Sequence, residues 1–282
     1  MSIKLVASDL DGTIISENNY IPDTNIQAID MMNKQNVDLA ICTGKSYSIS
    51  KSLCEKCNAT YGIFSNGSQI YNLKTGERIY DKTLQLEDIK TCSEIAKKNN
   101  LHVHCYSDNQ LVTEKLQYLD LRNFKLQEIP GFKFVVVPNV YEYIEKNNLP
   151  VHQFVISSNK NIDSIYDEIW ANSTVSISKI SKTGKYRDSI LNKEYEYLSI
   201  MPFNTNKSSA VNFLSNYLSI TNDEVMAIGD NLNDLDMIKS SGVGVAVANA
   251  YSELKKVANF TTKSSVSEGG FAEAVYKFIP KK

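Results

Sequence analysis

Two aspartates, Asp9 and Asp11, stand two residues apart directly after the apolar run 3–7. Where the backbone is extended, side chains two residues apart point to the same side. Two neighbouring carboxylates repel each other unless a cation lies between them or one of them binds a proton. Gly12 then permits a tight turn that brings backbone N–H groups toward a ligand. This segment therefore predicts carboxylate chemistry that involves a metal ion or a mobile proton.

A second acidic segment, residues 229–234, follows the apolar run 225–228 and contains Asp230 and Asp234. Carboxylate oxygens suit Mg²⁺, which keeps several of its waters and is often shared with a substrate phosphate. A calcium loop is the alternative, but the spacing lacks the regular ligand series and the closing glutamate of an EF-hand. The pattern therefore favours Mg²⁺ as the bound ion.

Polar residues also follow three further apolar runs: Thr43-Gly44, Asn66-Gly67 and Asn249. In a parallel α/β sheet, ligands bind outside the carboxyl ends of the strands. We therefore expect these positions and the two acidic segments to converge on one crevice. A hydroxyl group and backbone N–H groups at a helix N-terminus bind anions, which suits Thr43 and Gly44 to a phosphate.

Lys207 stands at the start of an expected helix, where its positive charge opposes the helix macrodipole. It is a poor stabiliser of that helix end but a useful partner for a phosphate. An exposed surface lysine is the alternative interpretation of this residue taken alone.

The alternation of strand-like and helix-like segments predicts an α/β fold with a doubly wound parallel sheet, built from residues 1–80 and 199–282. Residues 81–198 have a different pattern and predict an inserted α+β cap domain. The core strands are expected at 3–7, 37–42, 61–64, 225–228, 244–247 and 260–262. In the cap, helices are expected at 86–99 and 140–147, and strands at 102–106, 132–137, 152–157 and 174–180.

Composition narrows the class of protein. The net charge of −2 provides no basic surface for nucleic acid or anionic lipid. No apolar run approaches the roughly 20 residues that span a bilayer, and acids interrupt the N-terminal apolar stretch, unlike a secretory signal. The five cysteines are scattered and odd in number, which favours a reducing compartment. We expect a cytoplasmic protein, a monomer or weak homodimer, that binds neither nucleic acid nor membrane.

The segments 9–13, Thr43-Gly44, Lys207 and 229–234, in this order, resemble the four motifs of the haloacid dehalogenase superfamily. The insertion, Asn66-Gly67 and the stretch 245–250 are more specifically similar to Cof-type phosphatases. The resemblance covers essentially the whole chain. Two positions depart from the family pattern: Lys45 stands where arginine is common, and Ser208 where glycine is common.

The resemblance implies a role for each motif residue. Asp9 would be the nucleophile, and Asp11 would protonate the leaving oxygen and later activate water. Thr43 and Lys207 would hold phosphate oxygens, and Asn233 would position the phosphate or Lys207. Further contacts to the phosphate or substrate are expected from Gly44, Asn66 and Asn249.

The resemblance also implies the metal ligands. Asp9, the backbone carbonyl of Asp11 and Asp230 would ligate Mg²⁺, with Asp234 outside the direct ligands or bound through water. An ion is needed because a carboxylate cannot approach a phosphate dianion unless nearby charge is neutralised. The remaining histidine pair, His102-x-His104, is interpreted as ordinary strand residues rather than as a metal site.

The predicted function is that of a Mg²⁺-dependent phosphatase that hydrolyses small phosphorylated metabolites through an aspartyl-phosphate on Asp9. Sugar phosphates and similar phosphomonoesters are the leading substrates, and the cap would close over them and exclude bulk water. Two alternatives stay open. One is a phosphosugar mutase resembling phosphomannomutase, and the other is a non-catalytic sensor of phosphate ligands.

Overall fold

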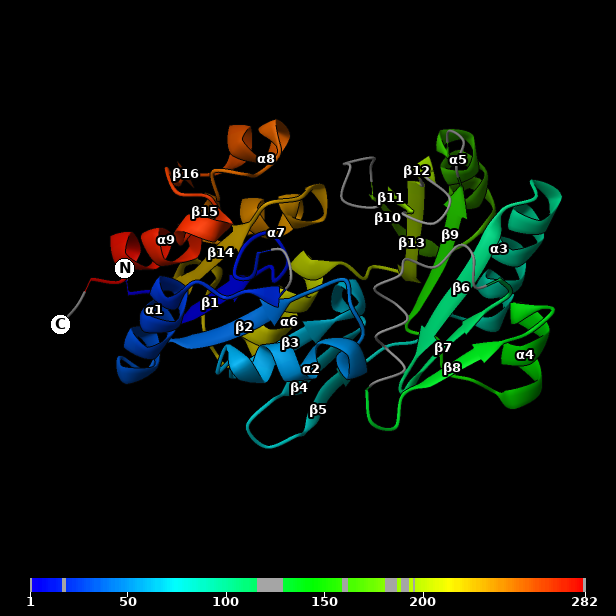
Figure 1. Ribbon diagram of the computed structural model, residues 1–282, viewed down its shortest axis with the longest axis horizontal. Coiled ribbons are helices and arrows are strands. Elements are labelled where there is room, and N and C mark those ends of the chain that lie inside the picture. The colour runs from blue at the N-terminus through cyan, green and yellow to red at the C-terminus, as the bar shows by residue number, and fades with distance from the viewer. Residues whose placement is uncertain are drawn as a thin grey trace. The chain divides into compact units, whose positions relative to one another are not determined.

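The computed structural model describes residues 2–16, 19–115, 129–158, 162–180, 187–188, 193–194 and 196–280. The chain divides into two compact units (Figure 1). The first comprises Met1–Asp81 and Asn206–Lys282, and the second comprises Lys82–Thr205. The insertion was expected at 81–198, and the second unit extends a few residues further along the chain; that it acts as a cap remains a prediction.

The first unit contains an eight-stranded sheet in the order β16-β15-β14-β1-β2-β3-β4-β5. Six strands run parallel: β1 (Leu5–Ser8), β2 (Asp38–Cys42), β3 (Tyr61–Phe64), β14 (Val225–Gly229), β15 (Val243–Ala246) and β16 (Phe260–Thr261). The strands β4 (Gln69–Asn72) and β5 (Arg78–Asp81) extend the sheet in antiparallel pairing. The predicted parallel α/β sheet is confirmed, and the β4–β5 pair is an addition that the sequence analysis did not contain.

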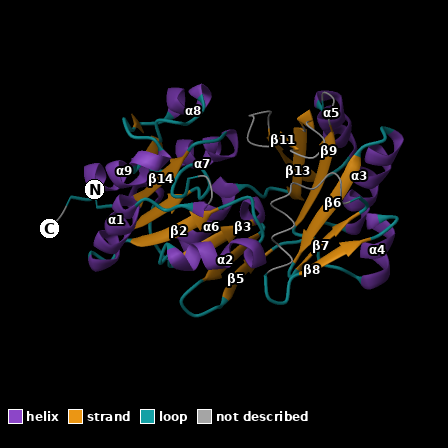
Figure 2. Cartoon of the chain, viewed as in Figure 1, coloured by secondary structure: helices purple, strands orange, loops and turns teal. Residues whose placement is uncertain are grey.

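Helices alternate with these strands, as the sequence pattern predicts (Figure 2). They are α1 (Asp23–Lys34), α2 (Tyr47–Lys56), α6 (Lys207–Tyr217), α7 (Leu235–Ser240), α8 (Ser252–Val257) and α9 (Gly270–Phe278). The helix α1 packs against α9, and α6 packs against α7. The strand β1 is buried along its whole length between β2 and β14, as a continuous apolar run in a covered parallel sheet requires.

The second unit is built on a six-stranded sheet in the order β10-β13-β9-β6-β7-β8. Its strands are β6 (His102–Ser107), β7 (Gln110–Thr113), β8 (Lys133–Val136), β9 (Gln153–Ser158), β10 (Val175–Ile180) and β13 (Glu196–Pro202). Its helices are α3 (Leu86–Lys98), α4 (Val140–Asn147) and α5 (Asp163–Asn172). All neighbouring strands are antiparallel except β7 and β8, and a separate short ladder joins β11 (Arg187–Asp188) to β12 (Lys193–Glu194).

The two faces of this second sheet differ in chemistry. Val103, Cys105 and Phe154 belong to a hydrophobic cluster shared with α3, α4 and α5. Because strand residues alternate between faces, His102 and His104 lie on the opposite face. Both histidines are buried there.

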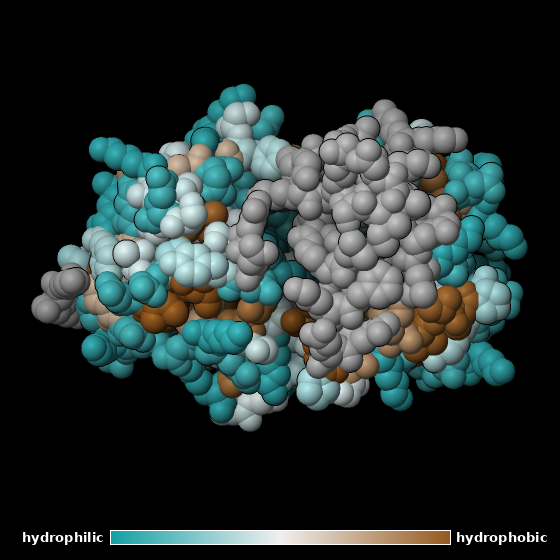
Figure 3. Space-filling model, viewed as in Figure 1, coloured by the Kyte–Doolittle hydropathy of each residue, from teal (hydrophilic) through white to brown (hydrophobic). Residues whose placement is uncertain are grey.

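The described surface is largely hydrophilic in the view of Figure 3, with smaller hydrophobic areas between the hydrophilic ones. Among the described helices, none combines the length and the apolarity that a membrane-spanning helix needs.

Candidate active site

Three buried carboxylates meet at the carboxyl ends of two neighbouring strands. Asp9 follows β1 and Asp230 follows β14, and the Asp9 amide donates to the Ile228 carbonyl at 2.9 Å. Asp234 lies on the short helical turn that follows Asp230. One carboxylate oxygen from each of the three aspartates lies within 4.8 Å of the others. The predicted convergence of the two acidic segments is therefore present in the folded chain.

Lys207 lies inside this acidic group and is only 1% exposed. Its Nζ donates to Asp9 Oδ1 and to Asp234 Oδ1, each at 2.6 Å. Burial by itself lowers the pKa of Lys207, but the carboxylates of Asp234 and Asp9 outweigh that effect and raise it above its usual range. The lysine is therefore a buried cation, and the alternative of an exposed surface lysine is wrong.

The start of α6 explains how Lys207 is positioned. The Asn206 side chain accepts a hydrogen bond from the Ser209 amide at 2.8 Å, and the Ser209 hydroxyl accepts one from the Asn206 amide at 3.0 Å. This reciprocal capping box fixes the first turn of the helix. Lys207, as the first residue of α6, is thereby directed at the acidic group despite the unfavourable macrodipole.

The acidic group places three carboxyl groups around a single lysine. Burial is the main cause that raises the pKa of Asp9 well above its usual range. Lys207 opposes this rise, while Asp234 and Asp230 add to it. Because three buried carboxyl groups share one ammonium, their charges disfavour one another, and the donor set fits a divalent cation that prefers oxygen ligands.

The two oxygens of Asp234 are already engaged. Oδ1 accepts from Lys207, and Oδ2 accepts from the backbone amides of Asp230 at 3.1 Å and Asn231 at 2.9 Å. Asp234 thus anchors both Lys207 and the loop that carries Asp230. Asp9 differs, because its Oδ2 accepts no hydrogen bond from a residue that the structure describes.

The loop after β1 packs directly against Asp230. The Thr13 hydroxyl donates to Asp230 Oδ1 at 3.3 Å. Gly12 has a φ of +86°, and a Cβ at this position would collide with Asp230 Oδ2. The sequence analysis gave Thr13 no role of its own. Its position in the motif 9–13, directly after Gly12, could have indicated that it belongs to the site.

Asp11 does not belong to the group of three buried carboxylates. Its side chain is 48% exposed, and its Oδ1 accepts a hydrogen bond from Lys45 Nζ at 2.6 Å. The strand β1 ends at Ser8, and the backbone turns at Gly12 to form a bridge between Asp11 and Ile15. The strand therefore ends before residue 11, although the Asp11 carboxylate is still one of the charges that raise the pKa of Asp9.

The residues after β2 and β3 form a second connected group at this edge of the sheet. Thr43 is buried, its hydroxyl accepts from the Lys45 amide at 3.2 Å, and its carbonyl accepts from the Asn66 amide at 3.1 Å. Asn233 Nδ2 donates to Asn66 Oδ1 at 3.1 Å, which links this group to the acidic loop. A Cβ on Gly44 would lie 3.1 Å from Asn66 Oδ1, so glycine permits this close approach.

Asn249 contacts the Asp11 loop. Its Nδ2 donates to the Gly12 carbonyl at 2.8 Å, and its Oδ1 accepts from the Val266 amide at 2.8 Å. The expected contact of Asn249 with substrate remains a prediction. In the structure its side chain joins two loops of the first unit.

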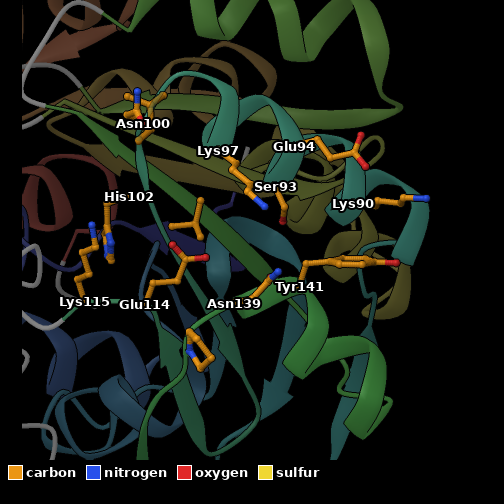
Figure 4. A pocket seen from close by; sticks show the side chains of 13 residues that line it. Lys90, Ser93, Glu94, Lys97, Asn100, His102, Glu114, Lys115, Asn139 and Tyr141 are labelled. Atoms are coloured by element: carbon orange, nitrogen blue, oxygen red, sulfur yellow. The ribbon is translucent and has the colours of Figure 1, made fainter.

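The second unit contains a separate cleft of about 400 Å³ between α3 and the start of α4 (Figure 4). Exposed lysine and glutamate side chains, such as Lys97 and Glu94, line it, and none of the predicted catalytic or metal residues does. The cleft has no buried carboxylate group, so the acidic group of the first unit remains the candidate active site.

The two histidines of β6 belong to the second unit and form no metal group with other described residues. Burial lowers the pKa of His102 to about 2 and that of His104 to about 3. Their imidazoles are therefore neutral near pH 7.

Comparison with known proteins places this geometry in a family. A family model described as haloacid dehalogenase-like hydrolase matches residues 6–275. The chain belongs to the haloacid dehalogenase-like hydrolases. A Streptococcus pyogenes protein with a phosphatase name is 27% identical, and the match covers 99% of each chain. A 5-amino-6-(5-phospho-D-ribitylamino)uracil phosphatase of Bacillus subtilis is also 27% identical, over 99% of this chain and 97% of its own.

Solved structures of this family share the fold over nearly the full chain. A haloacid dehalogenase-like hydrolase from Bacillus subtilis superposes with a TM-score of 0.80 at 19% identity, covering 97% of this chain and 99% of its own. A haloacid dehalogenase-like hydrolase from Bacteroides thetaiotaomicron has a TM-score of 0.77 at 24% identity, covering 98% and 99%. At these identities the likeness extends to the fold alone.

Proposed function

We propose that this chain is a Mg²⁺-dependent phosphatase that hydrolyses small phosphorylated metabolites through an aspartyl-phosphate on Asp9. Its membership of the hydrolase family supplies the reaction class. The observation that carries the finer proposal is the buried group in which Lys207 bridges Asp9 and Asp234 beside Asp230. This group combines a carboxylate nucleophile, a fixed cation and oxygen ligands suited to a metal ion.

Asp9, Asp230 and the backbone carbonyl of Asp11 are the proposed holders of Mg²⁺, with Asp234 outside the direct ligands. The hydrogen bonds already made by both oxygens of Asp234 support that division. The bound ion would neutralise charge on the phosphate oxygens as the phosphoryl group is transferred.

The residues of the chain divide the reaction between them. An Asp9 oxygen forms a bond to phosphorus while the bond from phosphorus to the leaving oxygen breaks, and Asp11 gives that oxygen a proton. Water then attacks phosphorus, the bond to Asp9 breaks, and Asp11 takes the proton of the water. Lys207 is held where it neutralises charge beside Asp9, and the Asp11 side chain is exposed enough to exchange protons with solvent.

The substrate class is proposed from the relatives and from the residue set. Two Bacillus subtilis relatives are named as phosphatases of 5-amino-6-(5-phospho-D-ribitylamino)uracil, a small phosphomonoester. We carry over to this chain only the class of small phosphomonoesters, with sugar phosphates as its leading members, because a fold does not specify the leaving group. The second unit is proposed to act as a cap that selects among them.

A panel of metabolite phosphates tests the proposal. Purified full-length chain is incubated with each compound and Mg²⁺, with and without a chelator, and inorganic phosphate is measured. We expect release that depends on Mg²⁺ and is lost in Asp9→Asn, with circular dichroism confirming that the variant is folded. Isomerisation of a sugar phosphate without phosphate release would support the mutase, and an inert wild-type chain that still binds phosphorylated ligands would support the sensor.

A further inference from the structure

The carboxylate of Asp11 has one side-chain partner among the described residues, which is Lys45. Lys45 Nζ lies 2.6 Å from Asp11 Oδ1, and the two residues are 34 positions apart in the sequence. The second oxygen, Oδ2, accepts no hydrogen bond from the part of the chain that the structure describes. The ion pair therefore fixes one oxygen of the carboxylate and leaves the other available.

The backbone of Lys45 is held firmly in the loop between β2 and α2. Its amide donates to the Thr43 hydroxyl at 3.2 Å, and its carbonyl accepts from the Ser65 amide at 2.9 Å. Thr43 and Ser65 are both buried. The amide and the carbonyl of Lys45 are thus both hydrogen-bonded, so the side chain that contacts Asp11 extends from a fixed backbone. This limits the positions that the Asp11 carboxylate can take.

Asp9 and Asp11 form ion pairs with different lysines. Lys207 is buried and is shared between Asp9 and Asp234, whereas Lys45 is 34% exposed and pairs with Asp11. Exposed ion pairs contribute little to stability, because water screens the charges and two flexible side chains lose freedom. Stability therefore does not account for the Lys45–Asp11 pair, and its effect on the orientation of Asp11 is the more important one.

We propose that Lys45 is a positioning residue that holds Asp11 Oδ1, so that Oδ2 faces the oxygen with which it exchanges a proton. This inference rests on the proposed function, in which Asp11 is the acid and base. Lys45 itself neither donates the proton nor forms a bond to phosphorus. Its contribution is that Asp11 does not have to be reoriented before each proton transfer.

The dependence of kcat/KM on the leaving group distinguishes a role of Lys45 in positioning Asp11 from a purely structural role. An alkyl phosphate expels a strongly basic alkoxide, which needs a proton as the bond to phosphorus breaks. In p-nitrophenyl phosphate the leaving nitrophenolate is weakly basic and needs little protonation. Loss of Lys45 should therefore reduce kcat/KM for an alkyl phosphate much more than for p-nitrophenyl phosphate, whereas general damage to the site would reduce both equally.

The test compares Lys45→Met with Lys45→Arg and with Lys51→Met, which removes a half-exposed lysine from α2. We expect Lys45→Met to lower kcat/KM for an alkyl phosphate by about 10-fold or more, and that for p-nitrophenyl phosphate by less than about 3-fold. Lys45→Arg should restore most of the loss because it keeps the charge. Lys51→Met should match the wild type.

A double-mutant cycle completes the test. If Lys45 acts through Asp11, then Lys45→Met should change kcat/KM little when Asp11 is already asparagine. Equal losses with both substrates, or a full further loss in the Asp11→Asn background, would overturn the inference while the proposed function stood. A rise in KM with unchanged kcat would also overturn it, since that pattern indicates a direct contact with the substrate. A wild-type chain without phosphatase activity would instead refute the proposed function.

Discussion

Lys207 illustrates how single residues determine the chemistry of this site. A buried ammonium loses its hydration, which is costly unless fixed anionic partners replace the water. Asp9 and Asp234 do so at 2.6 Å each, and Asp234 is itself held by two backbone amides of its own loop. The lysine is thus fixed beside Asp9 before any substrate arrives, which is the preorganisation that electrostatic catalysis of phosphoryl transfer requires.

Gly12 gives a prediction at the same scale. In Gly12→Ala the new Cβ would collide with Asp230 Oδ2 and displace this carboxylate from its place beside Asp9. Because Asp230 is a proposed metal ligand, we expect the affinity for Mg²⁺ to fall by about 10- to 100-fold. Isothermal titration of the full chain with Mg²⁺ measures the change directly, without a turnover assay.

Gly76→Ala is the matched control for backbone strain. Gly76 has a φ of +78°, close to the +86° of Gly12, but a Cβ there meets no atom within 4 Å. Both substitutions place alanine in the left-handed region, at a cost of about 1 kcal/mol or more. Only Gly12→Ala should weaken Mg²⁺ binding. If the two variants bind Mg²⁺ equally well, the proposed place of Asp230 in the metal site is wrong.

At the scale of elements, the strands that end at the site could be predicted because two local signals coincide. Residues 5–7 are apolar and buried, as a buried parallel strand requires, and the polar residues Ser8 and Asp9 follow them at once. The sequence analysis also predicted a helix that begins at Lys207, and α6 begins there. The ion pair between Asp11 and Lys45 could not be predicted, because it depends on where the backbone turns after β1.

The C-terminal boundary of the second unit was harder to predict than the strands that end at the site. The predicted boundary at 198/199 falls within β13, which covers Glu196–Pro202 and pairs with β9 and β10 of the second unit. The strand is a mainly apolar run that local sequence cannot assign to either sheet. Its pairing partners are distant in sequence, and such pairing leaves no local signal. The β4–β5 extension of the first sheet escaped prediction for a similar reason.

The histidines of β6 give a prediction at the scale of this element. Burial lowers the pKa of His102 to about 2 and of His104 to about 3, whereas a histidine in the unfolded chain titrates near 6.5. Above about pH 6.5 neither state binds these protons, and the histidines leave stability unaffected by pH. Below it the unfolded state binds them and the folded state does not, so stability falls as pH falls toward 3.

The two histidines together should contribute a slope of up to about 2.7 kcal/mol per pH unit well below pH 6.5, since each bound proton accounts for about 1.4 kcal/mol. Urea unfolding of wild type and of a His102→Gln/His104→Gln variant, followed between pH 7.5 and 4.5, measures this slope. The variant should lose stability less steeply in acid than the wild type. Parallel curves for the two proteins would contradict the assigned burial of neutral imidazoles.

At the scale of the whole molecule, the candidate site depends on segments from both ends of the first unit. Asp9 comes from the N-terminal part, and Lys207, Asp230 and Asp234 come from the part that follows the insertion. Relatives match this chain over nearly its full length, but at 27% identity they do not fix the substrate. The chemistry of the site and the choice of substrate are therefore separate questions.

The most direct test of the account is whether the phosphoryl group is transferred to Asp9. The full chain is mixed with Mg²⁺ and an active phosphomonoester and quenched within milliseconds. Borohydride then reduces any aspartyl-phosphate to homoserine, which peptide mass spectrometry locates. The account predicts homoserine in place of aspartate at position 9, and none when substrate is omitted. Phosphate release by an active chain with no modification at Asp9, or with the modification at another residue, would contradict it.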